Sequence, residues 1–133
     1  MVIDSSALVA ILLGEAEASD FTALIEADAV RLVSTTTVLE TSMVIGTRKG
    51  PAGIGELDRL LFRASIEEVP FNREQAGAAR REWLQFGKGR HKAALNFGDC
   101  CSYALAKVSG EPLLAKGDDF VRTDITLAGP GSP

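Results

Sequence analysis

The first residues read MVIDSSALVAILL (residues 1–13), an apolar start that is interrupted by one aspartate and two serines. Residues 1–3 suit a short buried strand, and Asp4, Ser5 and Ser6 offer side chains that cap a helix before ALVAILL. A strand that passes directly into a helix is the beginning of a β–α unit. This stretch therefore predicts an α/β fold with Asp4 at the join between strand and helix.

Strand-like and helical patterns alternate along the rest of the chain. We expect further strands at residues 30–34, 66–71 and 112–115, and helices at residues 15–27, 35–47, 56–65, 72–86 and 97–108. The glycines and the proline of residues 50–55 predict turns between two of these helices. The alternation favours a layered α/β structure with a mostly parallel sheet, and GPGSP (residues 129–133) is expected to be a disordered tail.

Composition indicates one globular domain. The chain has 133 residues, of which 46% are hydrophobic and 24% charged. No apolar run approaches the roughly 20 residues that span a bilayer, and the N-terminus lacks the basic segment of a signal peptide. The only cysteines, Cys100 and Cys101, are adjacent, which suits a reducing compartment better than a disulfide framework. A cytoplasmic location is expected.

The net charge of −4 argues against binding nucleic acid through overall charge. The charge is uneven, however, because a basic strip runs from position 80 to position 92, opposed only by Glu82. It consists of Arg80, Arg81, Lys88, Arg90, His91 and Lys92. One interpretation is a solvated helix end followed by a surface loop. The other is a strip that guides a phosphate backbone, with Lys88, Arg90, His91 and Lys92 in contact with it.

Acidic residues beside apolar segments are the candidates for chemistry, because a carboxylate is costly there unless something compensates it. They are Asp4, Glu40, Asp99 and the pair Asp118 and Asp119. Structural roles compete with functional ones: Asp4 suits a helix cap, and Asp99 suits the positive end of its helix. Glu40 is more informative, since no cation stands three or four positions away from it on its helix.

Together these acids suggest a site for Mg²⁺ or Mn²⁺, which prefer several oxygen ligands. Such ions polarise a scissile phosphate and lower the pKa of a bound water, so no covalent nucleophile is needed. The chain contains neither a G-x-S-x-G motif nor a phosphate-binding P-loop. A zinc site built from His91 with Cys100 and Cys101 is disfavoured, because adjacent thiols lack the usual spacing.

The chain resembles PIN-domain proteins of the VapC type, the toxins of bacterial VapBC toxin–antitoxin pairs. The resemblance rests on VIDSSAL, STTTVLETSMVI, GKGRHKAALNFGDCCSYALAK and LLAKGDDFVRTDI in this order. It implies a three-layer α/β/α PIN domain over residues 1–128 and a magnesium- or manganese-dependent endoribonuclease. It assigns catalytic and metal-binding roles to Asp4, Glu40 and Asp99, with Ser6 as a supporting hydroxyl.

The fourth acid stays open at this point. Gly117 stands where many relatives of this type have an acid or an asparagine. Asp119, directly before Phe120, matches the commoner acid and is assigned to the metal, while Asp118 is the candidate substitute for the missing one.

The resemblance also implies a cognate VapB-type antitoxin, which places a cation among the acids. The apolar helices ALVAILL and VLETSMVI favour a homodimer. The main alternative is a PIN-like module that binds RNA or a partner without cleaving. A receiver-like phosphoacceptor domain is disfavoured because serines follow Asp4 where such a domain has a second acid.

Overall fold

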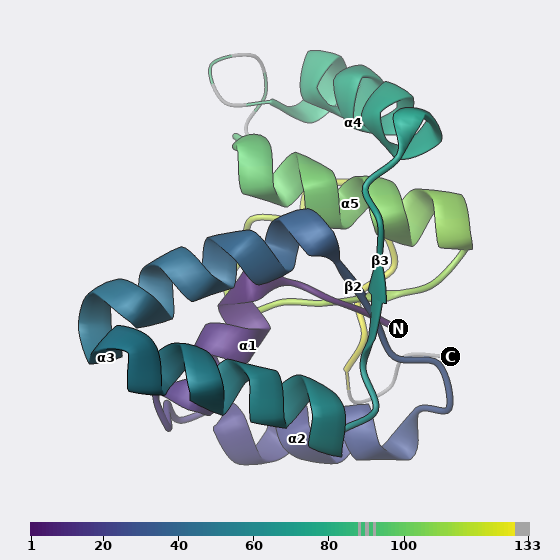
Figure 1. The fold of residues 1–133 in the computed structure, drawn as a ribbon. Coiled ribbons are helices and arrows are strands. Elements are labelled where there is room, and N and C mark those ends of the chain that lie inside the picture. Colours follow the sequence, from purple (N-terminus) through teal and green to yellow (C-terminus); the bar gives the residue numbers. More distant parts are fainter. Residues whose placement is uncertain (88, 90, 92, 130–133) are drawn as a thin grey trace.

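The computed structural model describes residues 1–87, 89, 91 and 93–129 (Figure 1). A four-stranded parallel sheet runs through the centre in the order β3-β2-β1-β4. The elements, in chain order, are β1 (Val2–Ile3), α1 (Ser5–Leu12), α2 (Ala18–Ala27), β2 (Leu32–Ser34), α3 (Thr35–Arg63), β3 (Glu67–Val69), α4 (Arg73–Phe86), α5 (Phe97–Ser109) and β4 (Leu113–Leu114). The expected α/β fold with a parallel sheet is confirmed, although every strand is shorter than expected.

Helices cover both faces of the sheet, which makes three layers. In Figure 1, α4 and α5 lie on one side, and α1, α2 and the second half of α3 lie on the other. Neighbouring strand residues enter opposite cores: Ile3 packs with the α1–α3 side, whereas Val2 packs with the α4–α5 side. Leu114 and Leu113 divide between the two cores in the same way. This alternation is the period of two that a strand buried on both faces requires.

Two strands pass into helices without a loop. Asp4 follows β1 and caps α1 by accepting a hydrogen bond from the Ser6 N–H at 3.1 Å. Ser34 ends β2 and caps α3 by accepting from the Thr36 N–H at 3.3 Å. Because parallel strands end at one edge of the sheet, both joins lie at that edge, where open α/β sheets bind ligands.

The turns expected within residues 50–55 are wrong except at Gly50. That residue breaks α3 with φ +68°, and the helix resumes at once with Pro51. Proline suits the first position of a helix because its missing N–H has no partner to lose there. Gly53 is helical and buried, and an added Cβ would lie 2.6 Å from Ile45 Cγ2. Its hydrogen side chain therefore serves close packing between the two halves of α3.

Two remaining expectations concern the C-terminal tail and membrane-spanning segments. Of the expected tail at residues 129–133, Pro130 to Pro133 lie outside the described residues. Among the helices that the structure does describe, none is long and apolar enough to cross a membrane.

Candidate functional site

The carboxyl edge of the sheet brings acids from four separate segments near one another. Asp99, in the first turn of α5, lies within electrostatic range of Asp4, Asp119 and Glu40. These acids come from the end of β1, the loop after β4 and the second turn of α3. The structure thus groups residues that are far apart in sequence at the place where strand order predicts a site.

Asp4 is buried, and hydroxyls hold both of its carboxylate oxygens. Ser6 Oγ donates to Oδ2 at 2.6 Å, and Ser102 Oγ donates to Oδ1 at 2.5 Å. Ser102 Oγ also lies 3.3 Å from Thr37 Oγ1 of α3. Ser6 Oγ in turn accepts the Lys116 N–H at 3.0 Å, which fixes the start of the loop after β4. The supporting contact expected of Ser6 is therefore present.

Asp99 closes a capping box at the start of α5. Asn96 Oδ1 accepts the Asp99 N–H at 2.9 Å, and Asp99 Oδ2 accepts the Asn96 N–H at 3.1 Å. Burial raises the pKa of Asp99 to about 7, and the charges of Asp4, Asp119 and Glu40 add to the rise, while the Asn96 N–H opposes it. Both the structural and the functional role considered for Asp99 thus fit one side chain. Its Oδ1 atom takes no part in the cap.

Glu40 lies against the backbone of α5. An added Cβ on Gly98 would stand 2.3 Å from Glu40 Oε2 and 2.6 Å from Oε1. No larger residue fits there unless the Glu40 carboxylate moves. Gly98 is therefore the residue that allows α3 and α5 to place Glu40 and Asp99 beside each other.

The loop after β4 separates its two aspartates. Asp119 is among the charges that raise the pKa of Asp99, whereas Asp118 is not. Both side chains are exposed, and the Asp118 backbone carbonyl accepts the Val121 N–H at 3.2 Å. Gly117, with φ +90°, turns the chain just before this pair. The geometry thus favours Asp119 over Asp118 as the fourth acid of the group.

The donor set suits a hard cation: carboxylates and hydroxyls, with no ion pair to Asp4, Glu40, Asp99 or Asp119 among the described residues. Burial raises the pKa of both neighbouring thiols, Cys100 and Cys101, so they are poor ligands. Within the described ranges, however, no three acids, cysteines or histidines are close enough to enclose a metal ion as they stand. Bringing the carboxylates around one ion requires side-chain rotation, and Asp99 Oδ1 is the oxygen that the cap leaves for this purpose.

The basic strip is only partly described. Lys88, Arg90 and Lys92 lie outside the described residues. His91 is exposed; its ring centroid lies 5.1 Å from that of Phe86 with the two rings nearly perpendicular, and its Nδ1 accepts the Ala93 N–H at 3.0 Å. His91 itself thus contacts the end of α4. The structure tests neither interpretation of the strip.

A family comparison matches residues 1–125 to the PIN domain. The chain belongs to the PIN-domain family. Ribonuclease VapC30 of Mycobacterium tuberculosis (strain ATCC 25618 / H37Rv) is 55% identical over 125 residues, which cover 94% of this chain and 95% of that protein. The expected kinship with VapC-type PIN proteins is thereby confirmed.

Solved structures agree on the fold of this PIN domain. The crystal structure of Mycobacterium tuberculosis VapC20, described as a toxin that cleaves the sarcin–ricin loop, superposes with a TM-score of 0.78 at 20% identity, covering 97% of this chain and 98% of that one. VapBC2 from Rickettsia felis, solved with a DNA fragment from its promoter, superposes with a TM-score of 0.72 at 18% identity, covering 95% of this chain and 94% of that one. A toxin–antitoxin complex from Klebsiella pneumoniae superposes with a TM-score of 0.69 at 17% identity, covering 92% of each chain.

Three residues of this PIN-domain site were not identified from the sequence: Ser102, Thr37 and Gly98. Ser102 follows Asp99 by three positions, so both lie on one face of α5. That spacing was the available signal for Ser102. Gly98 carried none, because its role depends on the distant Glu40.

Proposed function

We propose that this PIN domain, residues 1–128, is a Mg²⁺- or Mn²⁺-dependent endoribonuclease toxin that cleaves cellular RNA in the cytoplasm. The observation that supports it best is the grouping of Asp4, Glu40, Asp99 and Asp119 at the carboxyl edge of the sheet, where burial and the other three acids raise the pKa of Asp99 to about 7. Carboxylates that repel one another without a cation form a natural site for one. The 55% identity to a protein named Ribonuclease VapC30 supports RNA as the substrate.

In this proposal, Asp4, Glu40, Asp99 and Asp119 hold the metal. A bound divalent ion would polarise the scissile phosphate and lower the pKa of a water molecule. Ser6 and Ser102 hold the Asp4 carboxylate in one orientation through their hydroxyls. Such support matters because a ligand whose own position is fixed loses less freedom when the ion binds.

Asp118 and the basic loop have accessory roles. Asp118 is exposed beside the group and would substitute for the acid that many relatives have at the position of Gly117. Lys88, Arg90, His91 and Lys92 contact the RNA backbone. Replacing Lys88 and Arg90 together with alanine should weaken RNA binding and flatten its salt dependence, because fewer counterions are released.

The partners are a cognate VapB-type antitoxin and a second copy of the chain. The Klebsiella pneumoniae structure that shares this fold is a toxin–antitoxin complex, which supports an antitoxin here. A basic side chain of the antitoxin would occupy the place of the metal among the acids. Co-expression with the protein encoded next to it should yield a complex without ribonuclease activity.

The decisive experiment compares RNA cleavage by the purified chain with Mg²⁺, with Mn²⁺ and with EDTA. Asp99→Asn should abolish cleavage and should raise the melting temperature of the metal-free protein, because it removes a buried, repelled charge and keeps an oxygen for the Asn96 N–H. Asp58→Asn, at an exposed position of α3, should change neither property. Metal-dependent cleavage by Asp99→Asn at the wild-type rate would contradict the assignment, and a wild type that binds RNA without cutting it would favour a binding module.

A further inference from the structure

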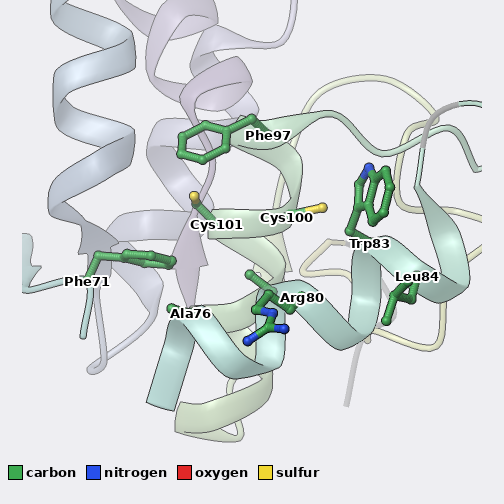
Figure 2. Close-up of a pocket in the computed structure, with 9 residues that line it drawn as sticks. Phe71, Ala76, Arg80, Trp83, Leu84, Phe97, Cys100 and Cys101 are labelled. Carbon is green, nitrogen blue, oxygen red and sulfur yellow. The ribbon is translucent and has the colours of Figure 1, made fainter. Parts of the chain in front are cut away.

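A groove of about 580 Å³ lies between α4 and the first half of α5 (Figure 2). Aromatic rings of Phe71, Trp83 and Phe97 line it, with Leu84 and Arg80 at the α4 side. Figure 2 shows Cys100 pointing toward Trp83, and Cys101 pointing toward the end where Phe71 and Phe97 lie. The volume is in the range of pockets that hold small ligands.

This groove adjoins the acidic site. Phe97 stands two residues before Asp99, and Cys100 and Cys101 follow it directly. The Glu40 carboxylate lies against Gly98, the residue next to Phe97, so the Phe97 end of the groove lies near the acids. A strand that runs from the acids past Phe97 would bring a neighbouring nucleoside to the groove.

The chemistry of the lining matches a nucleobase. Phe97 is 78% exposed, so its ring offers surface to an incoming group, and the Trp83 ring, 43% exposed, lines the groove on the α4 side. Arg80 is the cation of the described lining, and no acid of the described residues lines the groove. In a chain of net charge −4, such a surface is complementary to an anionic strand with flat bases. Unpaired RNA bases characteristically stack on aromatic rings and on arginine.

We propose that this groove binds an unpaired base of the RNA strand whose phosphate lies at the acids. The base stacks on Trp83 and Phe97, and Arg80 pairs with a phosphate at the rim. This inference rests on the proposed function and adds to it a base-binding subsite that selects unpaired RNA.

Trp83 supplies the direct readout, because it is the only tryptophan of the chain. Its fluorescence is measured in Asp99→Asn protein with Mg²⁺, titrated with a short unpaired oligoribonucleotide and with the same strand carrying abasic positions. The base-bearing strand should quench the emission and bind about tenfold more tightly than the abasic one. Equal affinity for the two strands overturns the proposal.

Substitutions locate the contact. Phe97→Leu should weaken binding of the base-bearing strand by roughly five- to a hundredfold and leave the abasic strand unaffected. Phe62→Leu is the matched control, since Phe62 is 86% exposed on α3 and does not line the groove. Its RNA affinity should equal that of the parent protein, and melting curves verify that both variants fold.

The outcomes separate this inference from the function on which it rests. If the wild type cleaves RNA with Mg²⁺ but Phe97→Leu binds both strands unchanged, the subsite is wrong and the nuclease stands. If the wild type neither binds nor cuts RNA, both the subsite and the proposed nuclease function are wrong. If Trp83 emission shifts with protein concentration and ignores RNA, the groove is an interface between two copies and the proposal is overturned.

Discussion

At the scale of single residues, the site depends on small groups as much as on acids. Ser6 and Ser102 hold Asp4 from two sides, and Gly98 gives Glu40 its place. Ser6 was expected from the resemblance, whereas the roles of Ser102 and Gly98 became visible only once the acids had been located in three dimensions.

Gly98→Ala should separate activity from stability. Alanine favours a helix by roughly 0.5–1 kcal/mol over glycine, so the free energy of unfolding should hold or rise. The new methyl group displaces the Glu40 carboxylate, which is the mobile end of its side chain. A displacement of this kind should slow RNA cleavage on the order of 100-fold.

The control for this change is Gly77→Ala on α4, where an added Cβ lies 3.5 Å from Arg81 Nη1, an ordinary contact. Urea unfolding and initial cleavage rates are measured on both variants. If Gly98→Ala cleaves like the wild type while Gly77→Ala does too, the position of Glu40 has no bearing on catalysis.

At the scale of elements, the sharp bend in α3 depends on contacts between its two halves. Gly53→Ala would place a methyl group 2.6 Å from Ile45 Cγ2 and 2.7 Å from Lys49 Cβ, both in the first half. Such overpacking should lower the free energy of unfolding by about 1–3 kcal/mol. Urea denaturation of the metal-free protein measures it.

Gly55→Ala, two residues further on, is the comparison. Its new Cβ would meet only the flexible end of Arg59, at 3.3 Å, so it should be neutral or stabilising. Similar losses of stability in both variants would mean that helix geometry, and not the contact with Ile45, restricts this segment.

The packing of α4 on α5 encloses a carboxylate. Glu82 is 8% exposed, and its Oε2 has no hydrogen-bond partner among the described residues. Burial raises the pKa of Glu82, the charge of Asp124 adds to the rise, and Lys107 and Arg81 oppose it. Asp124 is itself bound by Tyr103 and, at 2.8 Å, by Lys107.

Glu82→Gln should therefore stabilise the protein in a pH-dependent way. Ionising the buried acid costs free energy in the folded state, so the wild type loses stability as pH rises from about 4 through the raised pKa. The amide carries no charge, so the difference in free energy of unfolding between the variant and the wild type should grow with pH and then level off. Urea unfolding from pH 4 to pH 8 measures this, with the exposed Glu68→Gln as control; a gap that stays constant with pH would refute it.

The sequence could predict features that depend on neighbouring residues, but not those that depend on contacts between distant ones. Strand–acid joins such as Ile3–Asp4 carry local signals, namely an apolar run and a cap, so the sheet and the approximate positions of the acids were predictable. The immediate return to helix at Pro51 was not predictable, because Gly53 and Gly55 look like turn residues until the contact of Gly53 with Ile45 is known. Long-range contacts of this kind have no local signature.

At the scale of the whole molecule, α3 presents an apolar face that nothing in the described chain covers. Leu39 is 63% exposed and Met43 is 65% exposed, four residues apart on one side of the helix. Exposed apolar side chains grouped in this way mark surfaces of association. We expect the proposed homodimer to use them.

Replacing Leu39 and Met43 together with aspartate should convert the dimer to a monomer, because two charges would have to be buried in the interface. Sedimentation equilibrium measures the mass. Thr47→Asp, exposed one turn further along α3, should leave the dimer intact. A double variant with the same mass as the wild type would exclude this face, and a monomeric wild type would exclude the dimer.

The adjacent buried thiols of α5 have a practical consequence. Only a thiolate reacts with alkylating reagents, and burial raises the pKa of Cys100 to about 11 and also raises that of Cys101. Neither should be labelled while α5 is seated, although both stand between Asp99 and Ser102. The rate of cysteine labelling therefore measures how often α5, the helix that carries Asp99, opens transiently. A ligand that binds the acidic site and stabilises α5 should lower this rate.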